Sequence, residues 1–234
     1  MGLSMSPIIV ALDYPTKQAA LHMAKQLDPQ ICRVKVGKEL FTACGPAIVE
    51  ALQKEGFDVF LDLKFHDIPT TTAKAVNAAA QLGVWMVNIH ASGGQRMLAA
   101  CRDAIEKCRH KPLLIAVTVL TSMDSSDFKT LGHTISPEEY ALALARLSYK
   151  CGVDGVVCSA FEATDIKNHT CKDFLTVTPG IRLKENHSDD QRRIMTPAEA
   201  AKNNADYLVI GRPVTQAKSP SVVIQDIVRD LSSF

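Results

Sequence analysis

Residues 58–64 read DVFLDLK and run directly into FHDIP (65–69), so an apolar segment turns into a cluster of charged residues. A short run rich in β-branched and aromatic residues predicts a strand. Charged side chains at the end of a buried strand cost free energy unless they are paired or used. This stretch is therefore either a solvated strand end or a place where chemistry happens.

Runs of the same kind recur along the whole chain and predict eight strands. They lie at 8–13, 31–37, 58–64, 86–91, 113–120, 155–160, 174–180 and 207–213. The spacing leaves room for a helix after each strand, as right-handed βαβ units require. Several runs are almost continuously apolar, which is typical of a parallel sheet covered on both faces.

Helix signals fill the segments between these runs. Residues 136–139 and 196–199 each combine a capping box with proline at the first helical position, and 15–27 and 97–108 have amphipathic spacing. We therefore predict an α/β fold, a closed (β/α)8 TIM barrel, with residues 1–234 as a single domain. A doubly wound open sheet is the alternative, but no glycine-rich dinucleotide loop follows the first strand.

Composition limits the kinds of partner. The chain has 26 Lys and Arg against 25 Asp and Glu, a net charge of +1, which does not indicate a nucleic-acid surface. No apolar run is long enough to span a membrane. Seven cysteines without a Cys-x-x-Cys pair favour buried thiols in a reducing compartment. We therefore expect a cytoplasmic protein with no nucleic-acid or membrane partner, and any other partner has to be inferred from local sites.

Charged residues collect at the ends of the first three predicted strands. Active sites of such barrels lie at the C-terminal ends of the strands. Asp13 ends the first run, Lys35 lies near the end of the second, and Asp62 and Lys64 end the third. Residues two apart on a strand share a face, so Asp62 and Lys64 are expected to point together into the barrel mouth.

Two neighbouring positions are interpreted differently. Asp67 lies beyond the strand on a turn fixed by Pro69, so it need not reach the pocket of Lys64 and could project toward a neighbouring subunit. His66 has the opposite parity from Lys64 and is interpreted as structural. His90, isolated on the fourth run, is interpreted as a satisfied core histidine.

The last two strand ends each combine glycine with a nearby arginine, in PGIR (179–182), where one residue separates them, and in Gly211-Arg212, where they are adjacent. Barrels often bind phosphate after strands seven and eight, where glycine allows close backbone approach and arginine offers forked donors. The charged segment 182–195 is either a solvated loop or a lid. Thr121 and Ser122 after the fifth run could contact a heterocycle or simply start a turn. No group has metal-ligand spacing, so a metal-free site is expected.

Taken together, these strand-end motifs closely resemble orotidine 5′-phosphate decarboxylase of the bacterial type. The resemblance covers essentially the whole chain, and the string DLKFHDIP (62–69) is its most specific part, although Thr70 stands where family members often have Asn. It implies decarboxylation of orotidine 5′-monophosphate to UMP and CO2, the last step of UMP biosynthesis, without a cofactor. Lys64 would donate the proton to C6, Asp62 would face the substrate carboxylate, and Lys35 would order the charges.

The resemblance also implies how the substrate is held. Asp67, Ile68 and Thr71 would come from the partner subunit of a homodimer with shared active sites. The remaining contacts it implies are Asp13 and Lys35 to the ribose, Thr121 and Ser122 to the pyrimidine, and Arg182, Gln191, Gly211 and Arg212 to the phosphate.

Two alternatives remain open. A metal-dependent sugar-phosphate enzyme, such as 3-keto-L-gulonate 6-phosphate decarboxylase or hexulose-phosphate synthase, is similar in its Asp-x-Lys-x-x-Asp core. Those enzymes place a carboxylate where this chain has Lys35, which would repel Mg²⁺. The second alternative is a sensor that binds a phosphorylated ligand without turnover; the retention of Lys64 and of both Asp residues counts against it.

Overall fold

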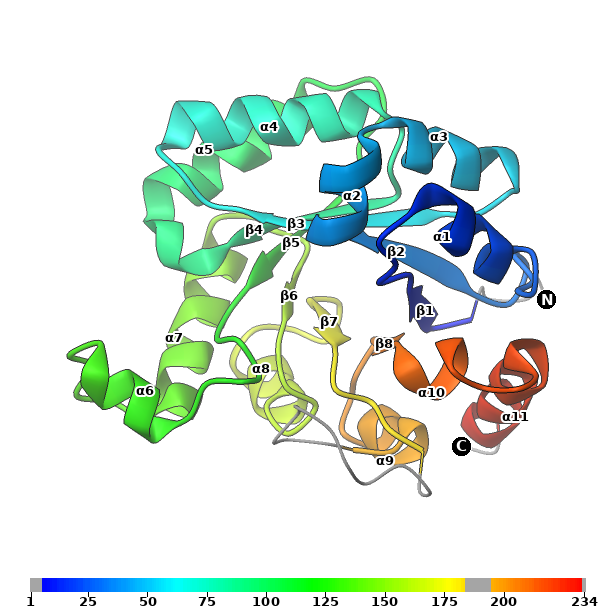
Figure 1. The fold of residues 1–234 in the computed structure, drawn as a ribbon. Coiled ribbons are helices and arrows are strands. Elements are labelled where there is room, and N and C mark those ends of the chain that lie inside the picture. The colour runs from blue at the N-terminus through cyan, green and yellow to red at the C-terminus, as the bar shows by residue number, and fades with distance from the viewer. Residues whose placement is uncertain (1–5, 184–194, 233–234) are drawn as a thin grey trace.

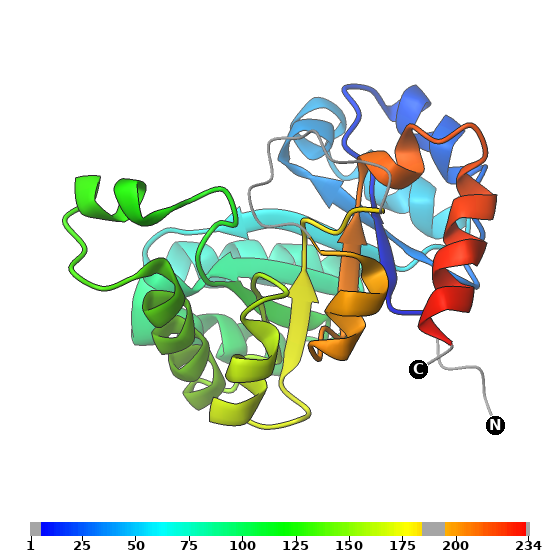
Figure 2. The same cartoon turned by 90° about the horizontal axis from the view of Figure 1, so that it is seen from below.

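The computed structural model describes residues 6–183 and 195–232, and in these ranges eight parallel strands close into one barrel (Figures 1 and 2). Strand order follows the chain, and β8 closes the barrel by pairing with β1. The predicted (β/α)8 barrel is confirmed, and the open sheet is wrong. The strands are β1 (Ile8–Ala11), β2 (Arg33–Gly37), β3 (Val59–Phe65), β4 (Met86–His90), β5 (Leu113–Val117), β6 (Gly155–Val157), β7 (Leu175–Thr178) and β8 (Tyr207–Ile210).

Helices follow every strand and surround the barrel in Figure 1. The predicted capping boxes at Ser136/Glu139 and Thr196/Glu199 are both formed, each followed by proline at the first helical position. The helices are α1 (Lys17–Ala24), α2 (Lys38–Cys44), α3 (Ala47–Lys54), α4 (Pro69–Gln81), α5 (Gly94–Glu106) after the 3-10 turn η1 (Ala91–Gly93), α6 (Ser125–Thr130), α7 (Pro137–Lys150), α8 (Ala163–His169), α9 (Pro197–Lys202), α10 (Arg212–Thr215) and α11 (Pro220–Leu231).

Several strands are shorter than their apolar runs. The run 113–120 leaves the sheet at Val117, and the run 155–160 leaves it at Val157. The residues that follow are still buried: Val119 lies in the loop after β5, and Cys158, just past β6, still donates its backbone N–H to the carbonyl of Val177 at 3.1 Å. Apolar composition therefore continues into the buried starts of the loops, and composition alone cannot locate the last hydrogen bond of a strand.

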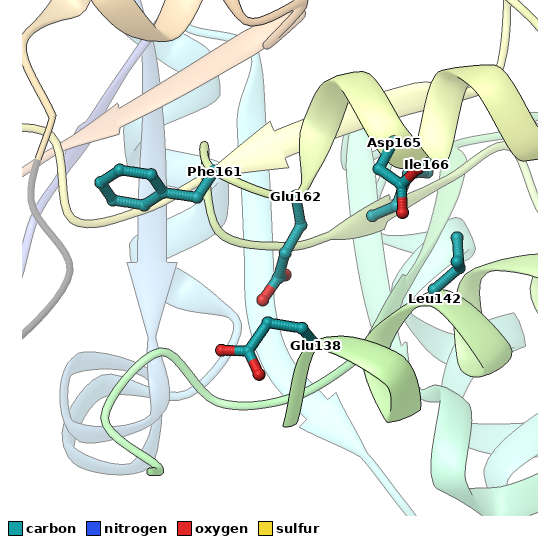
Figure 3. A pocket seen from close by; sticks show the side chains of 6 residues that line it. All are labelled: Glu138, Leu142, Phe161, Glu162, Asp165 and Ile166. Carbon is teal, nitrogen blue, oxygen red and sulfur yellow. The ribbon is translucent and has the colours of Figure 1, made fainter. Parts of the chain in front are cut away.

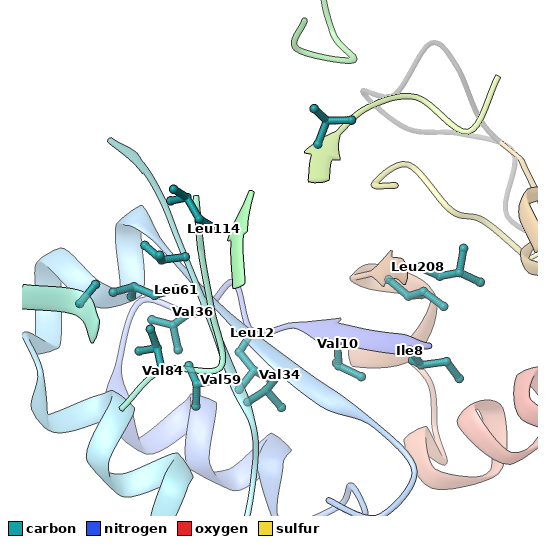
Figure 4. Close-up of a cluster of buried hydrophobic side chains, with 14 of the residues drawn as sticks. Ile8, Val10, Leu12, Val34, Val36, Val59, Leu61, Val84, Leu114 and Leu208 are labelled. Atoms are coloured by element: carbon teal, nitrogen blue, oxygen red, sulfur yellow. The ribbon is translucent and has the colours of Figure 1, made fainter. Parts of the chain in front are cut away.

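Side chains alternate between two cores. One set of strand residues, including Ile9, Phe60 and Val177, fills the barrel interior. The other set packs outward against the helices, as Figure 4 shows for Val10, Leu61 and their neighbours. The period of two along each strand therefore decides which residues point into the barrel, as in other closed barrels.

The N-terminal end of the barrel is closed by Arg33. Its guanidinium lies 4.2 Å from the ring centroid of Trp85 and 5.5 Å from that of Tyr207. It also pairs with Asp58 at 3.4 Å and donates to the carbonyl of Ser6 at 2.8 Å. In Figure 2 the arrows of β7 (yellow) and β8 (orange) both point to the top of the view, where α10 follows β8.

No helix within 6–183 or 195–232 is long and apolar enough to cross a membrane.

Candidate active site

Lys35 and Asp62 meet inside the C-terminal half of the barrel. β2 and β3 pair with Lys35 opposite Phe60 and Gly37 opposite Asp62, and these alternate residues all face inward. The Lys35 Nζ atom lies 3.3 Å from Asp62 Oδ2, and both residues are buried, at 8% exposure each. A charge pair at this depth is held only because each group finds an opposite charge.

Lys64, in an irregular part of β3, is a second ammonium group that contacts Asp62. Its Nζ donates to Asp62 Oδ1 at 2.6 Å. The pairing of β3 with β4 shifts register between Leu61 and Phe65, and Lys64 has a positive φ of 54°. Such a backbone is uncommon for a residue with a side chain, so it marks a locally strained position. Asp62 and Lys64 thus face the same pocket, as expected, through a less regular strand than expected.

Asp13 extends the charge array toward solvent. It lies two residues beyond the end of β1, its side chain is 64% exposed, and its Oδ1 accepts a hydrogen bond from Lys35 Nζ at 3.1 Å. The ammonium of Lys35 therefore bridges a buried and an exposed carboxylate. The order along the array is Asp13, Lys35, Asp62 and Lys64, with the signs alternating.

The charges in the array keep one another ionised. Burial alone would lower the pKa of Lys35, but the charges of Asp62 and Asp13 and their hydrogen bonds raise it above its ordinary value. Burial would raise the pKa of Asp62, but Lys35, Lys64 and the hydrogen bonds from Lys64 and Asn88 lower it below its ordinary value. Opposite charges at these distances outweigh desolvation, so both groups stay charged near neutral pH.

A cavity of about 240 Å³ opens directly over this array. Its polar lining combines three members of the array with Thr121 and Ser122 from the loop after β5, and the other walls are apolar. The lining residues are Lys35, Phe60, Asp62, Lys64, Val117, Val119, Leu120, Thr121, Ser122, Val157, Val177, Pro179 and Val209. A small apolar pocket with a few convergent charges is the usual form of a small-molecule site.

Asp67 and its neighbours face a different space. Asp67 Oδ1 accepts from the backbone N–H of Ile68 at 2.6 Å, and Ile68 is 67% exposed. Both line an open cavity of about 610 Å³ with Pro69 and residues 92–96. Thr71 is exposed in the first turn of α4. Within one chain, the structure therefore does not bring Asp67, Ile68 or Thr71 into the cavity that holds Lys64.

The predicted phosphate residues follow the last two strands. Arg182 is buried after β7 and donates to the carbonyl of Ile181 at 3.0 Å. Gly211 lies between β8 and α10, Arg212 is the first residue of α10, and both are half-buried. β7 and β8 are adjacent in the barrel, so these positions share one part of its rim. Gln191 lies outside the described residues.

The sequence interpretation missed two residues that touch the array. Asn88, fully buried on β4, donates from Nδ2 to Asp62 Oδ1 at 2.7 Å and accepts from the backbone N–H of Lys64 at 2.8 Å. Gly37 leaves little room for a side chain, because a Cβ would lie 3.2 Å from both Asp13 Oδ1 and Lys35 Nζ and these groups would have to shift. An amide inside the apolar run MVNIH was a usable signal for Asn88, since buried polar groups need partners.

Two histidines lie at the edge of the array. The rings of His66 and His90 are 5.3 Å apart between centroids, and His66 also lines the open cavity beside Asp67. Burial, followed by electrostatic interactions with His66, Lys38 and Lys64, lowers the pKa of His90 to about 4, and Asp62 opposes this only in part. His90 is therefore a neutral imidazole near pH 7.

A further cavity of about 350 Å³ lies between α7 and the start of α8 (Figure 3). It contains none of the predicted site residues. It is lined by Glu138, Leu142, Phe161, Glu162, Asp165 and Ile166.

Among the residues that the structure describes, no group of three or more His, Cys, Asp or Glu could hold a metal ion. The charge array under the cavity of about 240 Å³ is therefore the best candidate for an active site.

Comparison with known proteins agrees with the geometry. The model of the family described as "Orotidine 5'-phosphate decarboxylase / HUMPS family" matches residues 6–227. The chain belongs to this family. A relative named orotidine 5′-phosphate decarboxylase from Pseudomonas fluorescens (strain SBW25) is 56% identical over 99% of this chain and 100% of its own length. One of the same name from Pseudomonas paraeruginosa is 58% identical, with the same coverage.

Solved structures of similar proteins have the same fold. The chain is 33% identical to orotidine 5′-phosphate decarboxylase from Lactobacillus acidophilus, with a TM-score of 0.85 over 97% of this chain and 99% of that one. An uncharacterized conserved protein from Geobacillus kaustophilus is 38% identical, also with a TM-score of 0.85, over 96% and 100%. The predicted family is confirmed, and the predicted class, a carboxy-lyase, agrees with the name that the relatives carry.

Proposed function

We propose that this chain decarboxylates orotidine 5′-monophosphate to UMP and CO2, as the final step of UMP synthesis, without a cofactor. Family membership and the names of the full-length relatives support this substrate. The observation that carries the mechanism is the alternating array of Lys35, Asp62 and Lys64, with separations of 3.3 and 2.6 Å, under a small and largely apolar cavity.

The residue types fit the reaction. When the bond between C6 and the carboxylate breaks, the electron pair stays on C6, where no adjacent carbonyl can accept it. The Lys64 ammonium stabilises this developing charge and then transfers a proton to C6, while CO2 leaves. Asp62 faces the substrate carboxylate, and Lys35 holds Asp62 charged. The Lys64 amine afterwards regains its proton from solvent.

The rest of the substrate is assigned by position along the barrel rim. Thr121 and Ser122, which line the cavity, contact the pyrimidine. Asp13 and Lys35, joined at 3.1 Å, bind the ribose hydroxyls. Phosphate binding far from C6 can organise the site for the reaction. The phosphate ligands are Arg182, Gln191, Gly211 and Arg212.

The active unit in this proposal is a homodimer with shared sites. Asp67, Ile68 and Thr71 are exposed and lie outside the cavity of their own chain, beside an open cavity of about 610 Å³. An apolar residue that is 67% exposed next to a charged turn is a suitable contact for a second copy. Each subunit would therefore supply Asp67, Ile68 and Thr71 to the site of its partner.

The remaining predictions about the whole protein belong to the same proposal. The eight strands form one barrel, which supports a single domain over 1–234. All seven cysteines are free thiols, which supports a reducing, cytoplasmic setting.

A metal-dependent sugar-phosphate reaction is the second candidate within this family. In this chain both oxygens of Asp62 already contact ammonium groups, Oδ1 from Lys64 and Oδ2 from Lys35. Those positive charges would oppose a divalent cation at the same carboxylate. The third candidate, a sensor without turnover, needs no proton donor, so the half-buried Lys64 in the lining of the cavity counts against it.

The deciding experiment follows the ultraviolet absorbance of orotidine 5′-monophosphate with purified protein and excess EDTA. We expect rapid loss of substrate absorbance and formation of UMP. Unchanged absorbance at high protein concentration would contradict the proposal. Activity lost in EDTA and independent of a pyrimidine would support the metal-dependent candidate, and saturable binding without CO2 release would support the sensor.

The shared site has its own experiment. Lys64→Ala and Asp67→Ala proteins are each expected to be almost inactive. In a dimer of the two, one site has both an intact Lys64 and an intact Asp67 from the partner chain. An equal mixture should therefore regain roughly a quarter of wild-type activity. Lack of recovery after verified subunit exchange would show that the sites are not shared.

A further inference from the structure

Asn88 occupies an unusual place on β4. It is completely buried in the middle of an apolar strand, between Val87 and Ile89, which face the outer core. Alternation turns Asn88 into the barrel, above the interior residue Met86. A buried amide costs free energy unless its donors and acceptor are satisfied, so its partners explain its presence.

Asn88 spans an irregularity in the neighbouring strand. Leu61 pairs with Val87, and the next pair joins Phe65 to Ile89. Four steps along β3 thus correspond to two along β4, so β3 bulges between these pairs. The bulge contains both Asp62 and Lys64, and Lys64 has a φ of 54° within it. A bulge leaves backbone groups without their ladder partners.

The Asn88 side chain supplies the missing partner. Its Oδ1 accepts from the backbone N–H of Lys64 at 2.8 Å, and its Nδ2 donates to Asp62 Oδ1 at 2.7 Å. A backbone N–H can only donate, which fixes the amide with Oδ1 toward Lys64 and Nδ2 toward Asp62. The same Asp62 oxygen accepts from Lys64 Nζ at 2.6 Å. One amide therefore ties the strained backbone of Lys64 to the carboxylate that its ammonium contacts.

We propose that Asn88 is a positioning residue for the decarboxylation, one that holds the Lys64 backbone and the Asp62 carboxylate in the geometry of proton transfer. This inference rests on the proposed function. Neither aspartate nor alanine can replace both hydrogen bonds at this site. Aspartate would keep the acceptor for Lys64 but set a second carboxylate against Asp62, and alanine would remove both bonds.

The test compares Asn88→Ala, Asn88→Ser and Asn88→Asp with the wild type by steady-state kinetics. Loss of an orienting partner should lower kcat by ~10- to 100-fold. KM should stay within about threefold, because Asn88 does not line the cavity and contributes little to ground-state binding. The matched control is Asn77→Asp on α4, a partly buried asparagine whose Nδ2 contacts Cys108, which should retain wild-type kcat.

A second measurement does not depend on activity. Hydrogen exchange of the Lys64 amide should be slow in the wild type and clearly faster in Asn88→Ala and Asn88→Ser, while Asn88→Asp should keep part of the protection. Wild-type kcat in all three Asn88 variants would overturn the inference, as would unchanged exchange at Lys64. If wild-type protein failed to turn over the nucleotide, the proposed function would fall, and the exchange data would still decide whether Asn88 holds Lys64. Asn88→Asp, the nearest in shape, covers the case in which Asn88→Ala does not fold.

Discussion

Lys64 reaches Asp62 at 2.6 Å from a left-handed backbone, with φ at 54°, only two residues further along the same strand. The close approach depends on the bulge in β3 as well as on the alternation of the strand. A side chain in this region of φ costs about 1–2 kcal/mol relative to an ordinary backbone. In this strained conformation the Lys64 backbone N–H is held by Asn88, and the Lys64 ammonium contacts Asp62 in the lining of the cavity.

We predict that Lys64→Gly and Lys64→Ala both lose turnover but differ in stability. Removing the proton donor should lower kcat by at least ~10²- to 10⁴-fold in both. Glycine tolerates a positive φ, so Lys64→Gly should be more stable than Lys64→Ala by about 1–2 kcal/mol. Urea unfolding followed by circular dichroism measures the difference.

The control pair for this prediction is Lys74→Gly and Lys74→Ala. Lys74 is exposed within α4, where alanine should be the more stable by about 1 kcal/mol. Equal stability of the two Lys64 variants would show that the backbone at this position is not strained.

Gly37→Ala should disturb the array without straining the backbone. Gly37 has φ −91°, which any residue can adopt, but a Cβ would lie 3.2 Å from both Asp13 Oδ1 and Lys35 Nζ. One of these groups must move, so kcat/KM should fall by roughly 10-fold. A double-mutant cycle with Asp13→Ala checks the cause. If crowding against Asp13 is responsible, the two losses will not add; simple additivity would argue against it.

The stability of the protein should depend on His90 between pH 6.5 and about 4. The pKa of His90 is lowered to about 4 in the folded protein, so the unfolded chain binds a proton first as the pH falls. Folding is therefore weakened progressively from about pH 6.5 down to about pH 4, and unaffected above pH 7. The full shift corresponds to about 3 kcal/mol, which solvent screening at this half-buried site reduces to roughly 1–2 kcal/mol.

The measurement is the free energy of unfolding at several pH values for the wild type and for His90→Gln. The variant should lose less stability than the wild type as the pH falls through this window, although carboxylates still titrate in both. His22→Gln replaces an exposed histidine on α1 and serves as the control. Identical pH profiles for the wild type and His90→Gln would contradict the prediction.

Arg33 should matter for stability and not for catalysis. It closes the N-terminal end of the barrel against Trp85, Tyr207 and Asp58, at the opposite end from the array. Arg33→Ala removes a cation–π contact and leaves Asp58 without this partner, which should cost about 2–4 kcal/mol. Arg33→Lys should retain only part of the stability that Arg33→Ala loses, because lysine lacks the planar guanidinium. A lower melting temperature with unchanged kcat would support this; a large loss of kcat would contradict it.

Local patterns in the sequence predicted much of the fold. Eight apolar runs with helix-length spacing predicted the barrel, and the capping boxes at Ser136 and Thr196 predicted where α7 and α9 begin. These features depend on residues close together in the chain. The ends of β5 and β6 were placed too late, because buried loop residues such as Val119 have the same composition as the strands.

The candidate site was predictable where strand parity and strand-end position decide it. Asp62 and Lys64 share a face, and Asp13 and Lys35 lie near matching ends of neighbouring strands. Asn88 and Gly37 were not foreseen. The amide within the run MVNIH indicates that Asn88 needs buried partners, but which partners it finds depends on a register shift, and the role of Gly37 depends on the space between strands. No local pattern encodes either quantity.

The order of residues along the chain shows which positions are apolar, how often they repeat and which charges end the strands, and this is enough to predict a barrel with Lys and Asp at its mouth. The bulge of β3 at Lys64, the hydrogen bonds by which Asn88 fills the gap in its ladder, and the position of Asp67 outside the cavity of its own chain follow from packing. The reason is physical: periodicity follows from the local chain, whereas register, close approach and the balance of buried charge exist only once the strands are packed side by side.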